Sequence, residues 1–169
     1  MHKQYKLCPH FWCGFFIPCV FAQGFFLQKG KQDMQLTLIK NPDVSASLAY
    51  KVARVVYAET KAISLTVVEA MTSMIKNISD KNGIDIATVI TDKEIFDVLD
   101  EKSDRFQELN VHASNRNFQM CLRVAQRMLM GGFDDTCWGA TKFHRADDLP
   151  QWAIARGYIA DIDGFLFYL

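Results

Sequence analysis

The chain has 169 residues, of which 50% are hydrophobic and 22% are charged. This length and composition predict one globular domain with a short appendage. The formal net charge is zero, and the sequence has no long basic run, so its charge gives no reason to expect a nucleic-acid partner. Its cysteines and histidines follow no zinc-ligand pattern, and we expect neither a metal nor a cofactor.

The N-terminal region has the pattern of an export signal. It contains four lysines and no acid before its first aspartate, and residues 7–21 are mostly apolar. Small residues at and before Ala22 predict cleavage there, which makes residues 1–22 a signal peptide. Because the apolar run continues, residues 7–27 can instead form an uncleaved anchor that contacts the membrane. Both alternatives predict export to the periplasm, the cell envelope or the medium.

A linker over residues 23–43 precedes two predicted helices. Ser45 or Ser47 can cap the first helix, which runs to about Glu59. Residues 66–69 fit a capping box that opens the second helix, because a Thr stands three positions before a Glu.

The segment after the second helix is shorter and less regular. Asn82-Gly83 predicts a turn. Residues 84–90 are apolar and β-branched, and they predict either a short strand or a helical turn. Residues 91–94 fit a second capping box, which predicts a helix that reaches Leu99.

A third long helix follows a polar, irregular stretch over residues 100–112. Its apolar residues have helical spacing as far as Leu129, and Ser114 or Asn115 can cap its start. Gly131-Gly132 ends it, because glycine tolerates the left-handed conformation at a helix C-terminus.

Residues 133–169 are rich in aromatics and predict loops, a short helix over residues 151–155 and a small hairpin near Gly164. The fold class is therefore α+β and mostly helical, with a small β- and loop-rich C-terminal part. We expect residues 44–169 to form the functional domain.

Two cysteines, Cys121 and Cys137, lie in that domain. In an oxidising compartment they can form one disulfide, and two free buried thiols are the alternative.

Glu59 is a carboxylate in an apolar place. Leu48, Val52, Val55 and Glu59 recur at helical spacing, so Glu59 shares the stripe that faces the core. A carboxyl group that loses solvation there has a raised pKa and can hold a proton near neutral pH, as a general acid must. The ordinary alternative is a solvated charge, a cap or half of an ion pair.

Two blocks of sequence, residues 52–59 and 135–153, stand out together. The first ends in Tyr-Ala-Glu, and the second contains Gly-Ala-Thr-Lys-Phe-His followed by Pro-Gln-Trp-Ala. In this order they resemble the SleB/CwlJ-type cell wall hydrolases, and the resemblance covers about residues 48–169. It implies a lysozyme-like fold related to lytic transglycosylases and goose-type lysozymes. It also implies cleavage of peptidoglycan glycan strands between N-acetylmuramic acid and N-acetylglucosamine, with Glu59 as the catalytic acid.

The chain departs from the family pattern at four places. Thr60-Lys61-Ala62 replaces an Arg-Gly pair after the acid, and residues 105–108 lack the Trp of a Gln-Phe-Ser-Trp segment. Lys142 stands where the family often has His, and residues 165–168 lack the His of a closing His-x-Phe-Tyr. The alternative function is therefore a glycan-binding or structural module of the same fold with weakened or lost catalysis.

A two-carboxylate hydrolase would need a partner for Glu59. None of the available acids is convincing from its sequence context; they are Glu69, Asp104, Asp134 and Asp135. The resemblance to lytic transglycosylases implies a mechanism with one carboxyl group, in which the 6-hydroxyl of the substrate attacks.

The remaining predicted site residues would bind sugar. Aromatic faces stack on sugar rings, and polar groups orient the hydroxyls; the platform candidates are Tyr57, Phe143 and Trp152. Thr141 and His144 are hydrogen-bonding candidates, and Gly139 and Ala140 would let the backbone approach the glycan. Core packing is the alternative for each aromatic and for His144. We expect peptidoglycan glycan strands as the partner and a monomer as the functional unit.

Overall fold

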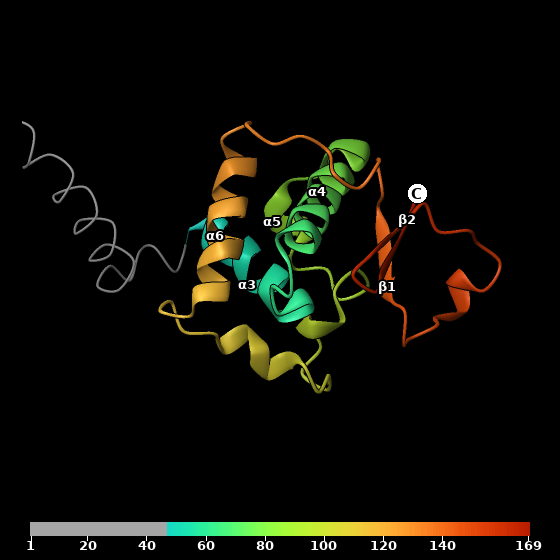
Figure 1. Cartoon of the computed structure of the whole chain (residues 1–169), viewed down its shortest axis with the longest axis horizontal. Coiled ribbons are helices and arrows are strands. Elements are labelled where there is room, and N and C mark those ends of the chain that lie inside the picture. The colour runs from blue at the N-terminus through green and yellow to red at the C-terminus, as the bar shows by residue number, and fades with distance from the viewer. Residues whose placement is uncertain (1–46) are drawn as a thin grey trace, which may run out of the picture. The chain divides into compact units, whose positions relative to one another are not determined.

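The computed structural model of the chain describes residues 47–169, all of which belong to one compact unit (Figure 1). The predicted signal peptide over residues 1–22, the alternative anchor over residues 7–27 and the linker over residues 23–43 lie outside the described residues. The α+β class is confirmed, because three long helices accompany a small antiparallel sheet. In the part that is described, no helix has the length and apolar character needed to cross a bilayer.

Helix α3, Leu48–Thr60, begins and ends as its sequence predicts. The Ser47 hydroxyl accepts a hydrogen bond from the Tyr50 amide at 3.3 Å, which satisfies one free donor of the first turn. Lys61 follows in the left-handed conformation with φ 53° and closes the C-terminus. The predicted apolar stripe faces the core, since Val52 and Glu59 are fully buried.

Helix α4, Leu65–Asn82, starts earlier than predicted, and the capping box over residues 66–69 is wrong. Ser64 is the cap, and its hydroxyl accepts from the Val67 amide at 3.1 Å. Glu69 is then too far along the helix to reach back to the cap, and it pairs with Arg127 instead. The predicted turn is confirmed, because Gly83 ends the helix with φ 65°.

Between the long helices the chain forms short turns. Of the two alternatives for residues 84–90 the helical turn is observed, as α5, Ile86–Val89. The second predicted capping box and its helix are wrong: the Asp92 carboxylate accepts from the Glu94 amide at 2.8 Å and holds a turn. Two 3-10 turns follow, η1, Asp97–Leu99, and η2, Phe106–Asn110.

Helix α6, Arg116–Leu129, is capped by Asn115, one of the two predicted caps. It packs on α3, where the rings of Tyr50 and Phe118 lie edge to face with centroids 4.9 Å apart. The core lies between α3, α4 and α6 and extends to the sheet (Figure 1); its largest fully buried side chains include Met71, Met74, Phe96, Phe118 and Phe167. Cys121 and Cys137 are both buried there as free thiols.

The sheet has three antiparallel strands, β1, Lys142–Arg145, β2, Ala160–Ile162, and β3, Phe165–Tyr168. Their order is β1-β3-β2, so β3 is central and β1 is an edge strand. The predicted hairpin is confirmed, and the predicted short helix is present as η3, Gln151–Ala153. Strand β1 was predicted as loop; it becomes a strand because it pairs with the distant β3, Lys142 opposite Tyr168 and Arg145 opposite Phe165.

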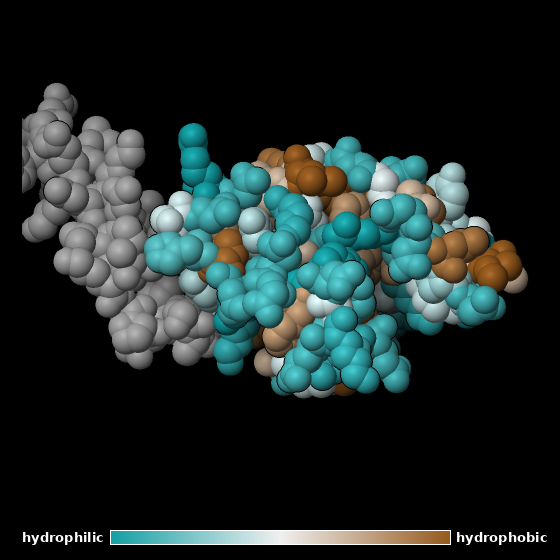
Figure 2. All heavy atoms as spheres, turned by 90° about the horizontal axis from the view of Figure 1, so that it is seen from below, coloured by the Kyte–Doolittle hydropathy of each residue, from teal (hydrophilic) through white to brown (hydrophobic). Residues whose placement is uncertain are grey.

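The surface offers no single dominant apolar area on the face drawn in Figure 2. That face is mainly hydrophilic, and its hydrophobic residues form separate small patches.

Candidate functional site

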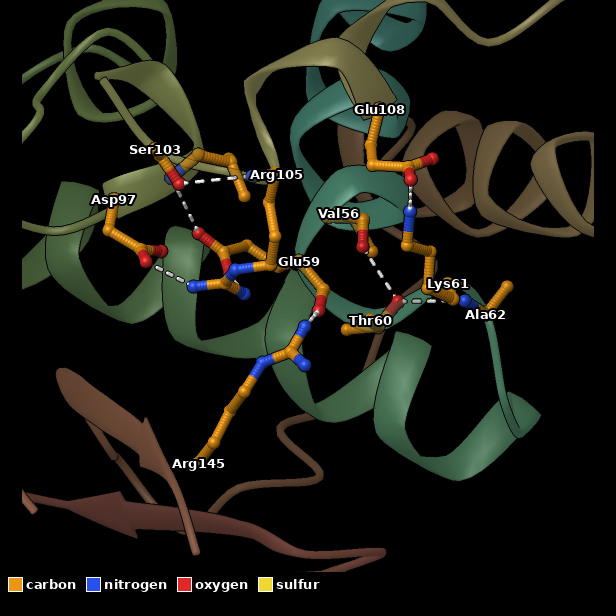
Figure 3. A network of polar contacts seen from close by, with 11 residues as sticks. Val56, Glu59, Thr60, Lys61, Ala62, Asp97, Ser103, Arg105, Glu108 and Arg145 are labelled. Atoms are coloured by element: carbon orange, nitrogen blue, oxygen red, sulfur yellow. Dashed lines mark hydrogen bonds and ion pairs between the residues drawn. The ribbon is translucent and has the colours of Figure 1, made fainter. Parts of the chain in front are cut away.

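Glu59 lies at the C-terminal end of α3 with no exposed surface. Its carboxylate accepts a hydrogen bond from the Arg105 guanidinium, with Oε2 2.7 Å from Nη1, and a long one from the Val98 amide at 3.4 Å. Arg105 also pairs with Asp97, so one guanidinium serves two carboxylates (Figure 3). Glu59 is therefore covered by the segment that runs from η1 to η2.

The pKa of Glu59 is raised from 4.5 to about 8. Burial is the main cause, because a carboxylate without water around it is penalised. The charge of Arg105 opposes this rise, and the nearby carboxylate of Asp97 adds to it. Although the short contact with Arg105 is geometrically an ion pair, the guanidinium is already paired with Asp97. Burial is the larger of these effects, so the pKa of Glu59 stays above its ordinary value.

Arg105 and Asp97 were not predicted as site residues. Sequence spacing offers no signal for them, because they lie 46 and 38 positions after Glu59 in irregular turns. The departure of residues 105–108 from the family pattern is the one clue. Arg105 stands in that segment, and its side chain is 24% exposed over the buried acid.

Arg145 is a third residue beside the acid that was not predicted. It stands at the end of β1, and its Nη2 donates to the backbone oxygen of Glu59 (Figure 3). Its guanidinium carbon lies 5.3 Å from the centre of the Phe165 ring. Lys61, directly after α3, pairs with Glu108.

A groove of about 650 Å³ opens beside the first residues of β1. It brings together three predicted sugar-binding residues, Thr141, Phe143 and Trp152. The C-terminal end of α4 and the turn after α5 supply the opposite side. Glu59 does not line this groove, so the predicted acid and the predicted sugar platforms do not share one cavity.

The groove is polar as well as aromatic. Lys81 and Lys142 line it together with Asp92 and Glu94, and none of these four takes part in an ion pair with a described residue. The Lys142 ammonium lies 5.4 Å from the centre of the Trp152 ring. Such a surface can bind a ligand that presents a flat apolar face and several polar groups.

Strand β1 connects the groove with the acid. Phe143 lines the groove, and Arg145, two residues further along, touches Glu59. Residues two apart in a strand lie on the same face at a spacing of roughly 7 Å. The rings of Phe143 and Phe96 are 6.1 Å apart, and Phe96 directly precedes Asp97. The two places are thus neighbours along one strand.

The structure places Tyr57 and His144 in packed positions. Tyr57 lies edge to face with Phe118, and its hydroxyl accepts from Asn115 at 3.2 Å. His144 is 6% exposed, and its Nδ1 lies 2.7 Å from the backbone oxygen of Arg145. Since a carbonyl only accepts, Nδ1 donates to it, and Nε2 lies 2.8 Å from the Tyr168 hydroxyl.

Gly139 and Ala140 belong to a tight turn before β1. Gly139 has φ 78°, in the region that favours glycine. Ala140 is buried, and its amide donates to the Cys137 oxygen at 3.0 Å. The Asp135 carboxylate accepts from the Cys137 amide at 2.9 Å. Neither Gly139 nor Ala140 lines the groove.

The four acids considered as partners for Glu59 lie elsewhere. Asp135 holds the turn before β1, and Glu69 pairs with Arg127. Asp104 and Asp134 are exposed. Asp97 is instead the carboxylate that shares a cation with Glu59.

Within residues 47–169, no group of three or more His, Cys, Asp or Glu side chains is arranged to hold a metal ion. Searches of family models, curated proteins and solved structures found no match to this chain.

Proposed function

We propose that the chain is a divergent SleB/CwlJ-type enzyme with a lysozyme-like fold. It is exported and cleaves the glycan strand of peptidoglycan between N-acetylmuramic acid and N-acetylglucosamine. The observation that carries this proposal is Glu59, a fully buried carboxyl group at the end of α3 whose pKa is raised to about 8. A carboxyl group that keeps its proton at neutral pH can donate it to a leaving oxygen.

The reaction needs one carboxyl group. Glu59 gives its proton to the glycosidic oxygen as the C1–O bond breaks, and positive charge develops at C1 of the muramic acid. Glu59, now a carboxylate, takes the proton of the 6-hydroxyl of the same sugar while that oxygen bonds to C1. The products are a 1,6-anhydro sugar and a free 4-hydroxyl, no water is consumed, and Glu59 recovers its proton.

The glycan would run along β1. Trp152 and Phe143 in the groove offer faces for sugar rings, and Thr141 offers a hydroxyl. Two amino-acid residues along a β-strand span roughly 7 Å. A glycan bound in the groove therefore needs one or two further sugar units to reach the end of β1.

Substrate must displace Arg105 before the acid can act. Glu59 has no exposed surface, whereas Arg105 is partly exposed above it. The segment around Arg105 consists of turns rather than a long helix, so a side-chain rotation there leaves the rest of the fold in place.

The same contact favours a second candidate function. A Glu59 that stays covered by Arg105 cannot reach a substrate, and the groove would then bind glycan without turnover. This candidate is a glycan-binding module of the same fold that has lost catalysis.

Turbidity loss of purified cell walls separates the two functions. We expect the wild-type chain to clear walls and Glu59→Gln to be slower by about 10²- to 10⁴-fold, since removal of a general acid has this effect. Glu69→Gln is the matched control, because it makes the same change in a surface pair with Arg127. If wild type and Glu59→Gln clear walls equally, or neither does, the enzyme function fails.

Mass spectrometry of the released fragments then tests the mechanism. An anhydro product is lighter by one water than the product of hydrolysis. A hydrolytic product would contradict the one-carboxyl mechanism and would make Asp97, the carboxylate that shares Arg105 with Glu59, the candidate base for a water molecule.

A further inference from the structure

Three cationic side chains come from segments near the C-terminal end of α3. Lys61 follows the helix, Arg105 comes from the turns, and Arg145 comes from β1 (Figure 3). The pKa of Lys61 is lowered by burial and then by the charges of Arg145 and Arg105. Lys61 is therefore close enough to both guanidinium groups to be affected by their charge.

Arg145 differs from the other two because it has no carboxylate partner among the described residues. Lys61 pairs with Glu108, and Arg105 pairs with Asp97 and contacts Glu59. The described hydrogen bond of Arg145 goes to a backbone oxygen. Its Nε is buried and has no hydrogen-bond partner in the part of the chain that the structure describes.

Capping of α3 explains only part of this arrangement. The C-terminus of a helix carries partial negative charge and attracts one cation. One N–H of Arg145 satisfies a carbonyl there, but a guanidinium has five N–H donors. The carboxyl groups of Glu59, Asp97 and Glu108 contact Arg105 or Lys61, and none of them pairs with the Arg145 guanidinium.

We infer that Arg145 binds a carboxylate of the substrate next to Glu59. The inference rests on the proposed function and deepens it, because it names the group of the muramic acid that a side chain binds beside Glu59. Muramic acid carries a lactyl carboxyl group, free or extended by a peptide with its own carboxylates, whereas N-acetylglucosamine is neutral. The planar fork of arginine matches two carboxylate oxygens.

The geometry keeps the guanidinium ready for such a ligand. The Phe165 ring supports one side of it, and Arg145 and Phe165 are opposite each other in the β1–β3 register. The terminal nitrogens of the guanidinium are the atoms that a ligand carboxylate would bond, because Nε is buried.

The test uses the full chain and two sugars that differ in the lactyl group. N-acetylmuramic acid and N-acetylglucosamine are titrated separately while the Nε–H resonance of Arg145 is followed by NMR. We expect N-acetylmuramic acid to move this resonance and to bind about tenfold tighter than N-acetylglucosamine, as a charged hydrogen bond provides. Equal binding of the two sugars, or an Arg145 resonance that does not move, overturns the inference.

Variants and a second anion sharpen the result. Arg145→Lys should keep part of the preference for N-acetylmuramic acid and Arg145→Met should lose it, with thermal melting as the check on folding. If Arg145→Met does not fold, the two-sugar comparison on the unchanged chain decides. Inorganic phosphate should compete more weakly than N-acetylmuramic acid; competition at equal or lower concentration would mean a general oxyanion site and would overturn the assignment to the substrate.

The outcome can be separated from that of the proposed function. If the chain prefers N-acetylmuramic acid but does not clear walls, the carboxylate site is supported and the enzyme function is contradicted. If the chain clears walls but binds the two sugars equally, the enzyme function is supported and the carboxylate site is contradicted.

Discussion

The end of α3 and the groove beside β1 use opposite physical conditions. At the end of α3, Glu59 is removed from water and held under Arg105, and the loss of solvation makes it an acid. In the groove, charged and aromatic side chains remain open, and its lysines and carboxylates have no ion-pair partners among the described residues. The difference shows that a carboxyl group keeps its proton where water is excluded, whereas side chains that bind a ligand must stay accessible to solvent.

The two regions are joined by a single short strand. Phe143 belongs to the groove and Arg145 to the acid, although both belong to β1. Changes in the groove should therefore affect binding, and changes to Glu59 or Arg105 should affect the proton that Glu59 holds. Three predictions use this division, beginning with the largest expected effect.

The first prediction concerns stability and pH at the buried end. Because burial raises the pKa of Glu59 from 4.5 to about 8, the folded chain holds a proton that the unfolded chain releases between these values. The stability that depends on protonated Glu59 is fully present below the pKa of the unfolded chain. It is lost as pH rises through the pKa of the folded chain. The free energy of unfolding should fall by up to about 5 kcal/mol across this range.

Urea unfolding of wild type and Glu59→Gln at about pH 5 and about pH 9 measures this effect. In Glu59→Gln, the free energy of unfolding should lack the part of its pH dependence that Glu59 causes. In Glu69→Gln, it should depend on pH as in wild type. Parallel pH dependence in wild type and Glu59→Gln would mean that the acid is not desolvated, and the contrast between the two regions would disappear.

The second prediction concerns Arg105, whose charge opposes the effect of burial on the pKa of Glu59. Arg105→Met should raise that pKa by about one unit or more, because an opposite charge at this distance has an effect of this size. It also uncovers the acid. The alkaline limit of wall clearing should therefore move to higher pH.

Clearing rates across the pH range provide the measurement for Arg105. Arg127→Met is the matched control, since it removes the cation from the surface pair with Glu69. A shift of the alkaline limit to lower pH, or the same shift in Arg127→Met, would contradict the role of Arg105 over Glu59.

The third prediction concerns the open region and compares two tryptophans. Trp152 lines the groove and packs on His144 and Tyr168, whereas Trp138 is 67% exposed and does not line it. In a Glu59→Gln background, Trp152→Ala should weaken cosedimentation with cell walls by about tenfold, as loss of a central aromatic contact does. Trp138→Ala should have little effect.

Trp152→Phe controls for packing, because it keeps a ring against His144 and Tyr168. It should bind walls better than Trp152→Ala. Equal losses in Trp138→Ala and Trp152→Ala would show that the groove is not the place where the glycan binds.

Local patterns predicted the elements whose stabilising contacts are close in sequence. Ser47 and Asn115 cap helices within three residues, and Gly83 ends α4 through its own backbone. The two capping boxes failed because a competing local bond was available in each case, at Ser64 and at Asp92. A short polar side chain close by can decide where a helix starts.

By itself, the sequence determined the amphipathic helices and the burial of Glu59, since both follow from a periodicity of 3.6 residues along one segment. Only the tertiary structure decided what surrounds that carboxyl group. Arg105 and Arg145 reach Glu59 from 46 and 86 positions away, and β1 exists because it pairs with β3. The groove likewise joins α4, β1 and η3. Contacts between distant segments form when helices and strands pack to bury apolar surface, and no periodicity in a single segment encodes which side chains then meet.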